Sequence, residues 1–259
     1  DRAAIEHYRR TIADLAPSSR HVAELTGYLD VSVCPFPYQF TVGCVSECAF
    51  CNRASERGKV SRPEVAVDAI EHAVTEYGAR EFIFLNSELN FGRTYVHRFC
   101  NEIIKRGLNI LWTDSCEFRG LDEETLALMK EAGCVAIWYG LEASTDRMLR
   151  YINKRTTIDH AVDVLYQAKK IGIYNCLNII CGMPYETEMD VQATIEFLNE
   201  HRDAIDTTQV NIFYLQGGPF FDRPGDFGLG LRGYEEQVGE TMCQAFDEVN
   251  EGLSWEEKK

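Results

Sequence analysis

Short apolar runs alternate with stretches of helical periodicity from residue 37 onward, and this alternation constrains the fold more than any other feature of the chain. It predicts repeated βα units around a parallel sheet, because parallel strands need a crossover connection between them, usually a helix. Six such units predict an α/β fold, a partial (β/α)6 TIM-like barrel that stops short of the eight units of a closed barrel. The strands are expected at 38–42, 81–89, 109–116, 134–143, 174–184 and 208–216.

Helix signals lie between these strands. The first helix is expected at 61–78, with a capping box of Ser61 and Glu64 at its start and Gly78 at its end. Thr187 is expected to cap a later helix. The remaining helices are expected at 94–107, 122–133, 145–152, 159–171 and 188–201.

Two flanks depart from the βα repeat. Apolar residues at helical spacing predict an N-terminal helical extension over residues 1–33. Residues 217–233 contain six glycines, two prolines and three phenylalanines, and this composition predicts an irregular loop of the kind that forms lids, binding loops or linkers. The expected organisation is therefore an extension at 1–33, a barrel core at 34–216, and an irregular C-terminal loop with a helical tail at 217–259.

The acidic charge of the chain restricts its partners. A formal net charge of −15 repels phosphate backbones, and no stripe of Lys and Arg offsets it. Nucleic acid is disfavoured as a substrate, and a peptide or a small molecule is expected instead. No apolar run approaches the roughly 18 residues of a membrane span, and the first residues lack the features of a signal peptide. We expect a cytoplasmic protein without a membrane partner.

Cys44, Cys48 and Cys51 form a compact group among ten cysteines, directly after the first expected strand. Chemistry in α/β folds is placed at this carboxyl edge of the sheet. A disulfide would use two of the thiols and leave the third without a partner. A structural zinc site needs four ligands, usually with a second cysteine pair that this sequence lacks. Three thiolates suit a four-iron cluster whose fourth iron has no protein ligand.

The spacing Cys-x3-Cys-x2-Cys, with Phe50 just before the last cysteine, resembles the signature of radical S-adenosylmethionine (SAM) enzymes over about residues 36–216. The resemblance implies a partial βα barrel with a [4Fe-4S] cluster on the three cysteines, SAM at the open iron, and Phe50 beside these cofactors. It also implies that one electron from the reduced cluster cleaves SAM to a 5′-deoxyadenosyl radical, which abstracts hydrogen from the substrate. An electron donor such as flavodoxin or ferredoxin is then an expected partner.

The same resemblance implies SAM contacts at the ends of later strands. Glu88 takes the place of the glutamate in a Gly-Gly-Glu motif that binds the SAM amino group, although Asn86 and Ser87 replace the glycines. "YGLEASTDRMLRYINKRT" resembles the branch that includes methylthiotransferases, cobalamin-dependent enzymes and oxygen-independent coproporphyrinogen oxidase. In that branch Glu142 would reach the SAM ribose and Lys154 the SAM carboxylate. An acidic acceptor suits hydroxyls, and an ammonium suits a carboxylate.

Three further residues complete the expected site. Asn178 and Ile180, on one face of the fifth expected strand, match a ribose-binding position and an adenine contact of the same branch. Cys116 ends the third expected strand and is a candidate catalytic residue, because a thiol near the radical site can donate a hydrogen atom.

The reaction itself stays open at the level of sequence. We expect a radical SAM enzyme that abstracts hydrogen from a peptide or small molecule, as in peptide epimerisation. The first alternative is the core of a cobalamin-dependent radical SAM methyltransferase, with cobalamin as a further cofactor. A tRNA methylthiotransferase is opposed by the acidic charge. A non-catalytic iron–sulfur protein would be expected to have a fourth cysteine ligand, and it gives no reason for Glu88, Glu142 and Lys154 to gather at the cluster.

Overall fold

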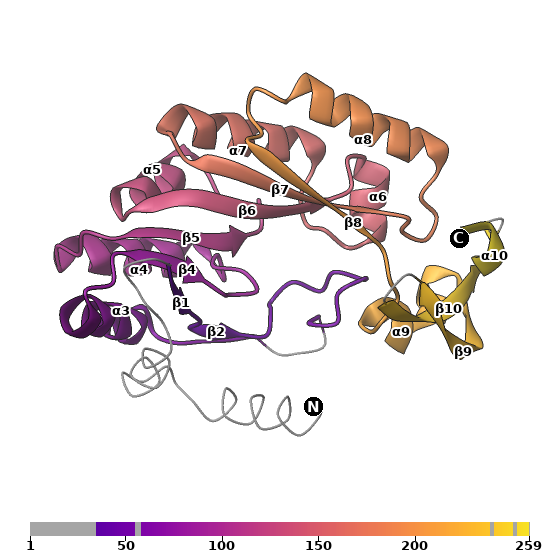
Figure 1. Cartoon of the computed structure of the whole chain (residues 1–259). Coiled ribbons are helices and arrows are strands. Elements are labelled where there is room, and N and C mark those ends of the chain that lie inside the picture. Colours follow the sequence, from indigo (N-terminus) through magenta and orange to yellow (C-terminus); the bar gives the residue numbers. More distant parts are fainter. Residues whose placement is uncertain (1–34, 55–57, 239–240, 251–252, 259) are drawn as a thin grey trace.

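A six-stranded parallel sheet forms the centre of the molecule (Figure 1). The computed structural model describes residues 35–54, 58–238, 241–250 and 253–258. The spatial order of the strands follows the chain: β1 (Phe36–Tyr38), β4 (Glu81–Phe84), β5 (Leu111–Cys116), β6 (Cys134–Glu142), β7 (Tyr174–Cys181) and β8 (Thr207–Ile212). The sheet does not close, since β1 and β8 stand at its two ends. The predicted α/β partial barrel is confirmed.

Helices connect successive strands and pack on one face of the sheet, as the crossover rule requires. Asp122, Thr145, Thr157 and Thr187 cap four of these helices with side-chain oxygens, and Thr187 and Asp190 form a complete capping box. The connecting helices are α3 (Pro63–Tyr77), α4 (Arg93–Lys105), α5 (Glu123–Glu131), α6 (Asp146–Tyr151), α7 (Ile158–Ile171) and α8 (Glu188–Glu200).

Side chains of the sheet alternate between a helix-covered face and an inner face. On the helix-covered face, the ring of Trp112 lies 5.4 Å from that of Phe84 and 6.1 Å from that of Phe99 on α4, measured between ring centroids. All three side chains are buried, so this face carries the core. The inner face is defined here by five half-buried residues: Thr113, Ser115, Trp138, Asn178 and Ile180.

The first strand differs from the prediction. Residues 38–42 do not form one strand, because Thr41–Val42 (β2) leaves the main sheet and pairs antiparallel with Lys59–Val60 (β3). The cause is Asn86, whose Oδ1 accepts hydrogen bonds from the backbone N–H groups of Phe40 and Thr41 at 3.1 and 3.0 Å. The Asn86 side chain thus supplies the hydrogen-bond acceptor that a neighbouring strand would otherwise provide.

The expected capping box at the first helix is also wrong. Arg62 is the N-cap residue of α3, and it makes no side-chain cap. Pro63 at the first helical position needs no N–H partner, which makes a side-chain cap less necessary. Glu64 instead pairs with Arg98 at 2.5 Å. The expected end of the helix at Gly78 is confirmed, with φ of 71°.

The C-terminal segment is more regular than its composition predicts. Residues 217–233 contain a short helix, α9 (Pro219–Asp222), a 3₁₀ turn at Pro224–Phe227, and the start of strand β9 (Leu229–Val238). β9 pairs antiparallel with β10 (Thr241–Glu248), and α10 (Trp255–Lys258) follows. The irregular loop expected at 217–233 is therefore wrong, whereas α10 is a short helix in the expected tail. Burial of apolar side chains outweighs the low strand propensity of the glycines, since Phe220, Leu229 and Phe246 are at most 3% exposed.

The expected N-terminal extension at 1–33 lies outside the described residues. The three domain ranges stay predictions. Among the helices that the structure describes, each is too short or too polar to cross a bilayer.

Candidate active site

The three cysteines lie in the loop between β2 and β3, at the carboxyl edge of the sheet, and backbone groups from distant segments hold this loop. Ala49 N–H donates to the carbonyl of Ile152 at 2.9 Å, and the carbonyl of Ala49 accepts from Phe220 N–H at 2.8 Å. Asn153 donates through Nδ2 to the carbonyl of Glu47 at 2.7 Å. The segment after α6 and the start of α9 therefore fix the loop from two sides.

Glu88 fixes the same loop from β4. Its Oε1 accepts from Val45 N–H at 3.0 Å and from the Cys44 thiol at 3.2 Å, and its Oε2 accepts from the Ser46 hydroxyl at 3.2 Å. The side chain is 1% exposed, so these bonds satisfy a carboxylate that water does not reach. As placed, Glu88 positions the cysteine loop. Its contact with the SAM amino group stays a prediction.

The three thiols are not arranged around a position for a single metal ion. No three His, Cys, Asp or Glu side chains within the described ranges are grouped closely enough to bind one metal ion. A mononuclear zinc site thus finds no support in that part of the chain. A four-iron cluster does not need such convergence, because each cysteine ligates a different iron. The three free thiols on one anchored loop fit the cluster.

Burial disfavours the thiolate form of these cysteines. It raises the pKa of Cys48 to about 12, against the opposing charge of Lys154. Burial and the neighbouring Glu88 raise the pKa of Cys44 to about 12. Metal binding must therefore displace a proton from each of these thiols at neutral pH.

Lys154 lies in a buried cluster of charges beside the cysteine loop. Its Nζ is 2.6 Å from a carboxylate oxygen of Glu117 and 3.6 Å from one of Glu142, and its side chain is 3% exposed. Burial disfavours its charge, but Glu117, Cys48 and Glu142 together raise the pKa of Lys154 above its usual value. A buried ammonium with two carboxylates is a common mark of a functional site.

Glu142 adopts a backbone conformation that glycine prefers, with φ of 69°. Such a conformation costs about 1 to 3 kcal/mol and tends to mark functional sites. It occurs at a register shift between β6 and β7, which turns the Glu142 side chain toward Lys154. A Cβ atom on Gly140 would lie 2.5 Å from Glu142 Oε1 and 2.9 Å from Lys154 Nζ. Gly140 therefore makes room for the pair.

Asn178 pairs in register with Gly140 and with Gln209 of β8, so it lies on the inner face at the same level as the charged cluster. Its side chain makes no hydrogen bond to another of the described residues, which leaves its amide oxygen and its amide nitrogen available. Ile180 lies one inner-face position further along β7 and packs against the edge of the core. Phe50 is half-buried in the cysteine loop and also packs against the core.

Cys116 is not brought to the inner face. It follows Trp112 and Asp114 on the helix-covered face and pairs in register with the fully buried Tyr139. Burial, with Asp114 as a secondary cause, raises the pKa of this thiol well above its usual value. The placement gives no support to a hydrogen-atom donor, and we do not propose that role further.

Two residues of this site escaped the sequence analysis. Glu117 directly follows β5, as Glu88 follows β4 and Glu142 ends β6, so the rule that strand ends carry the chemistry would have found it. Gly140 carries no such signal, because its role is visible only through the side chains that would collide with a larger residue.

A comparison with protein-family models places residues 38–198 in the radical SAM superfamily. The chain belongs to this family. Its members are enzymes that use SAM and a [4Fe-4S] cluster, so the recognition made from the cysteine spacing is confirmed.

Two curated relatives show the range of the family around this chain. The uncharacterized methyltransferase PH0819 of Pyrococcus horikoshii is 32% identical over 158 residues, which are 60% of this chain and 34% of that protein. The anaerobic magnesium-protoporphyrin IX monomethyl ester cyclase of Rubrivivax gelatinosus is 29% identical over 165 residues, 62% of this chain and 30% of that one. The chain spans about a third of the length of these relatives.

A solved structure shares the fold. The radical SAM methyltransferase TsrM of Kitasatospora setae, in a structure with tryptophan substrate and a SAM analogue, superposes with a TM-score of 0.67 at 18% identity. The match covers 77% of this chain and 41% of TsrM. A second TsrM structure carries cobalamin and a [4Fe-4S] cluster.

Proposed function

We propose that this radical SAM enzyme removes a hydrogen atom from a C–H bond of a small-molecule or peptide substrate bound over the inner face of the sheet. The observation that carries the proposal is Lys154, a buried ammonium that pairs with Glu117 and Glu142 and lies close enough to Cys48 of the cysteine loop to act on its charge. A non-catalytic electron carrier has no use for such a group. In this family the cofactors supply, when bound, a one-electron cleavage of SAM that generates an adenosyl radical.

Each predicted site residue other than Cys116 has a role in this proposal. Cys44, Cys48 and Cys51 hold the cluster, and Glu88 holds the loop that carries them. Lys154 binds the SAM carboxylate as a charge-assisted partner, while Glu117 keeps the ammonium charged before SAM binds. The adenosine contacts are proposed for Glu142, Asn178 and Ile180, at the ends of β6 and β7. Phe50 packs beside the cluster.

The first test is anaerobic reconstitution with iron and sulfide, followed by dithionite and SAM. We expect cluster absorbance near the family's usual region and release of 5′-deoxyadenosine. Cys48→Ala should abolish both, whereas Cys243→Ala, which lies on β10, should keep them. An intact cluster that releases no 5′-deoxyadenosine would exclude the radical reaction.

A second candidate is methyl transfer with cobalamin, favoured by the methyltransferase name of the Pyrococcus relative. The same assay separates the two, because methyl transfer from SAM yields S-adenosylhomocysteine. Hydroxocobalamin added before reduction should raise that product only if this candidate is right. Peptide epimerisation gains no support from the relatives. The cytoplasmic location and the disfavoured binding of nucleic acid stay predictions.

A further inference from the structure

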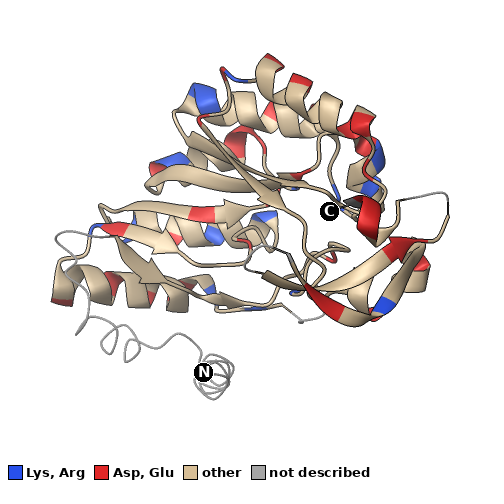
Figure 2. Ribbon diagram, turned by 45° about the vertical axis from the view of Figure 1, so that its right-hand side comes forward, with Lys and Arg blue, Asp and Glu red and all other residues tan. Residues whose placement is uncertain are grey.

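The position of Glu117 is critical to the candidate site, because its carboxylate is the nearer of the two partners of Lys154. Lys154 Nζ lies 2.6 Å from Glu117 and 3.6 Å from Glu142. Many other carboxylates of the chain lie on the outer helices and the C-terminal hairpin (Figure 2), where water weakens their interactions. The Glu117 side chain is only 16% exposed, so a small displacement would change how well it stabilises the buried ammonium.

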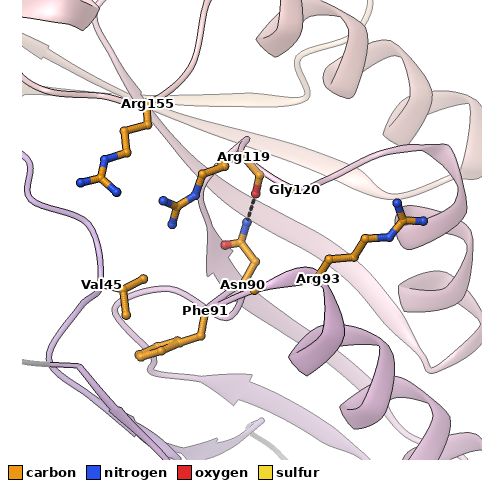
Figure 3. A pocket seen from close by; sticks show the side chains of 8 residues that line it. Val45, Asn90, Phe91, Arg93, Arg119, Gly120 and Arg155 are labelled. Carbon is orange, nitrogen blue, oxygen red and sulfur yellow. Dashed lines mark hydrogen bonds between the residues drawn. The ribbon is translucent and has the colours of Figure 1, made fainter.

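Glu117 begins the loop of residues 117–122 that joins β5 to α5. On one side, Arg119 and Gly120 of this loop line a cavity of about 450 Å³ that belongs to the candidate site (Figure 3). On the other side, the buried ring of Phe118 stacks on Tyr139 of β6 with ring centroids 4.8 Å apart. Side-chain packing therefore holds the loop from the core side, and hydrogen bonds are needed to hold its backbone at the cavity.

Asn90 supplies these hydrogen bonds. Its Nδ2 donates to the carbonyls of Glu117 and Arg119, both at 2.7 Å, and its Oδ1 accepts from Glu117 N–H at 2.9 Å. The bond to Arg119 is the dashed line in Figure 3. Asn90 is 3% exposed, so water hardly competes for its amide. One side chain thus binds both backbone groups of Glu117 and the carbonyl two residues further along.

Asn90 is itself held firmly by the two residues before it. Leu89 N–H donates to the carbonyl of Ser115 at 2.8 Å, and Glu88 binds the cysteine loop. Glu88, Leu89 and Asn90 are each at most 3% exposed, although loops usually lie at the surface. Consecutive residues of one segment after β4 therefore bind the cysteine loop, the end of β5 and the loop that carries Glu117.

We propose that Asn90 is a positioning residue for SAM binding: it holds Glu117, and Glu117 in turn holds the Lys154 ammonium at the place where the SAM carboxylate binds. The inference rests on the proposed function, in which Lys154 is the partner of that carboxylate. Asn90 does not need to touch SAM. Its bonds are present before the cofactor arrives, so binding does not have to order the ammonium first.

Asn90→Ala tests this role in the reconstituted enzyme. We expect SAM to bind about tenfold more weakly, because Lys154 loses a fixed partner, while the cluster content equals that of wild type. The KM for SAM should rise to match, and kcat for 5′-deoxyadenosine release at saturating SAM should stay within about threefold of wild type. Equilibrium dialysis with labelled SAM, cluster absorbance and the kinetics of 5′-deoxyadenosine release measure these quantities.

Asn175 offers a matched control. It is fully buried at the amino end of β7, and its Nδ2 donates to the carbonyls of Leu165 and Ala204 at 2.8 and 2.7 Å. Asn175→Ala therefore removes a buried amide that joins two carbonyls, as Asn90→Ala does, but at the end of the sheet away from the candidate site. We expect both variants to lower the thermal unfolding midpoint, and only Asn90→Ala to weaken SAM binding.

Further variants test whether Asn90 acts through Glu117. Glu117→Gln removes the charge that Asn90 is proposed to position, so it should weaken SAM binding by itself. The double variant Asn90→Ala/Glu117→Gln should bind SAM no more weakly than the weaker single variant, because both changes remove the same interaction. Asn90→Asp keeps the size of the side chain but loses both donated bonds, so it should bind SAM as weakly as Asn90→Ala.

The outcomes separate the two proposals. Wild-type enzyme with an intact cluster that neither binds SAM nor releases 5′-deoxyadenosine contradicts the proposed function. If wild type binds SAM and Asn90→Ala binds it as tightly as Asn175→Ala does, the positioning role is wrong. Additive losses in the double variant, or wild-type affinity in Asn90→Asp, also overturn it. So does loss of the cluster in Asn90→Ala, because Asn90 would then serve the cysteine loop or the fold rather than Lys154.

Discussion

At the scale of single residues, the candidate site holds three charged side chains in a place that water hardly reaches. Lys154, Glu117 and Glu142 are all buried or nearly so, and each is acceptable only because the others are close. Gly140 sets how close they come, because its missing side chain leaves space for the Glu142 carboxylate and the Lys154 ammonium. The site therefore depends on an absent methyl group as much as on the charges.

Gly140→Ala tests this arrangement. The added Cβ would collide with both Glu142 and Lys154, so we expect SAM affinity to fall by roughly tenfold while the cluster still assembles. Equilibrium binding of SAM to the reconstituted protein, alongside cluster absorbance, measures both effects. The control is Gly233→Ala in β9, where a Cβ meets nothing within 4 Å. Equal SAM affinities in Gly140→Ala and Gly233→Ala would show that Glu142 and Lys154 can move apart without loss of SAM binding.

Asp114 makes stability depend on pH. It lies fully buried on β5, where its carboxylate accepts from Asn86 Nδ2 at 2.6 Å and from Ser115 N–H at 2.8 Å. Desolvation outweighs these bonds and raises its pKa to about 7. The folded state then holds a proton that the unfolded state releases near pH 4, so this residue's contribution to stability falls as pH rises from about 4 to about 7.

The loss can reach at most about 1.4 kcal/mol per pH unit. We expect the thermal unfolding midpoint of the wild type to fall more steeply between pH 5 and 8 than that of Asp114→Asn, whatever the difference between them at any one pH. Differential scanning fluorimetry across that range measures both slopes. Parallel slopes would mean that Asp114 is already ionised at pH 5.

At the scale of elements, the C-terminal segment is part of the active-site scaffold. Gly218 has φ of 80°, and a Cβ there would lie 2.3 Å from the carbonyl oxygen of Cys51. Its neighbour Phe220 bonds the backbone of the cysteine loop and is itself fully buried. α9 therefore packs over the cysteine loop, although the two segments are far apart in the sequence.

Gly218→Ala should loosen this contact. Both the backbone conformation and the close approach to Cys51 forbid a methyl group, so we expect the cluster to bleach in air several times faster than in wild type. The decay of cluster absorbance after exposure to oxygen gives the rate. Gly225→Ala, in the same segment but with nothing within 4 Å of its Cβ, should behave as wild type. If both variants decay alike, α9 does not protect the loop.

The elements also show what sequence can predict. β5 to β7 and their helices carry strong periodic patterns and were predicted within a few residues, because burial of one face dictates that pattern. β9 was not predicted, because its glycines have a low strand propensity and tertiary packing is what stabilises the strand. The cysteine loop was recognised from its spacing alone, whereas Asn86, whose side chain ends the first strand, acts through contacts with residues more than forty positions away.

At the scale of the whole molecule, the open sheet leaves the inner face accessible at one side. Gln209 and Asn211 of β8 lie beside Asn178 and Ile180 and are exposed, so a polar rim borders the proposed SAM site. The exposed β8 edge is thus the side from which we expect substrate to approach the inner face.

The buried trio of Lys154, Glu117 and Glu142 also carries a formal charge of its own, one positive and two negative. SAM has a sulfonium, an ammonium and a carboxylate, so it brings a net single positive charge that balances the trio. The products of the proposed cleavage, methionine and 5′-deoxyadenosine, have no net charge and balance nothing. We therefore expect the site to hold charged SAM more tightly than these neutral products, so that charge balance itself favours exchange of spent cofactor for fresh.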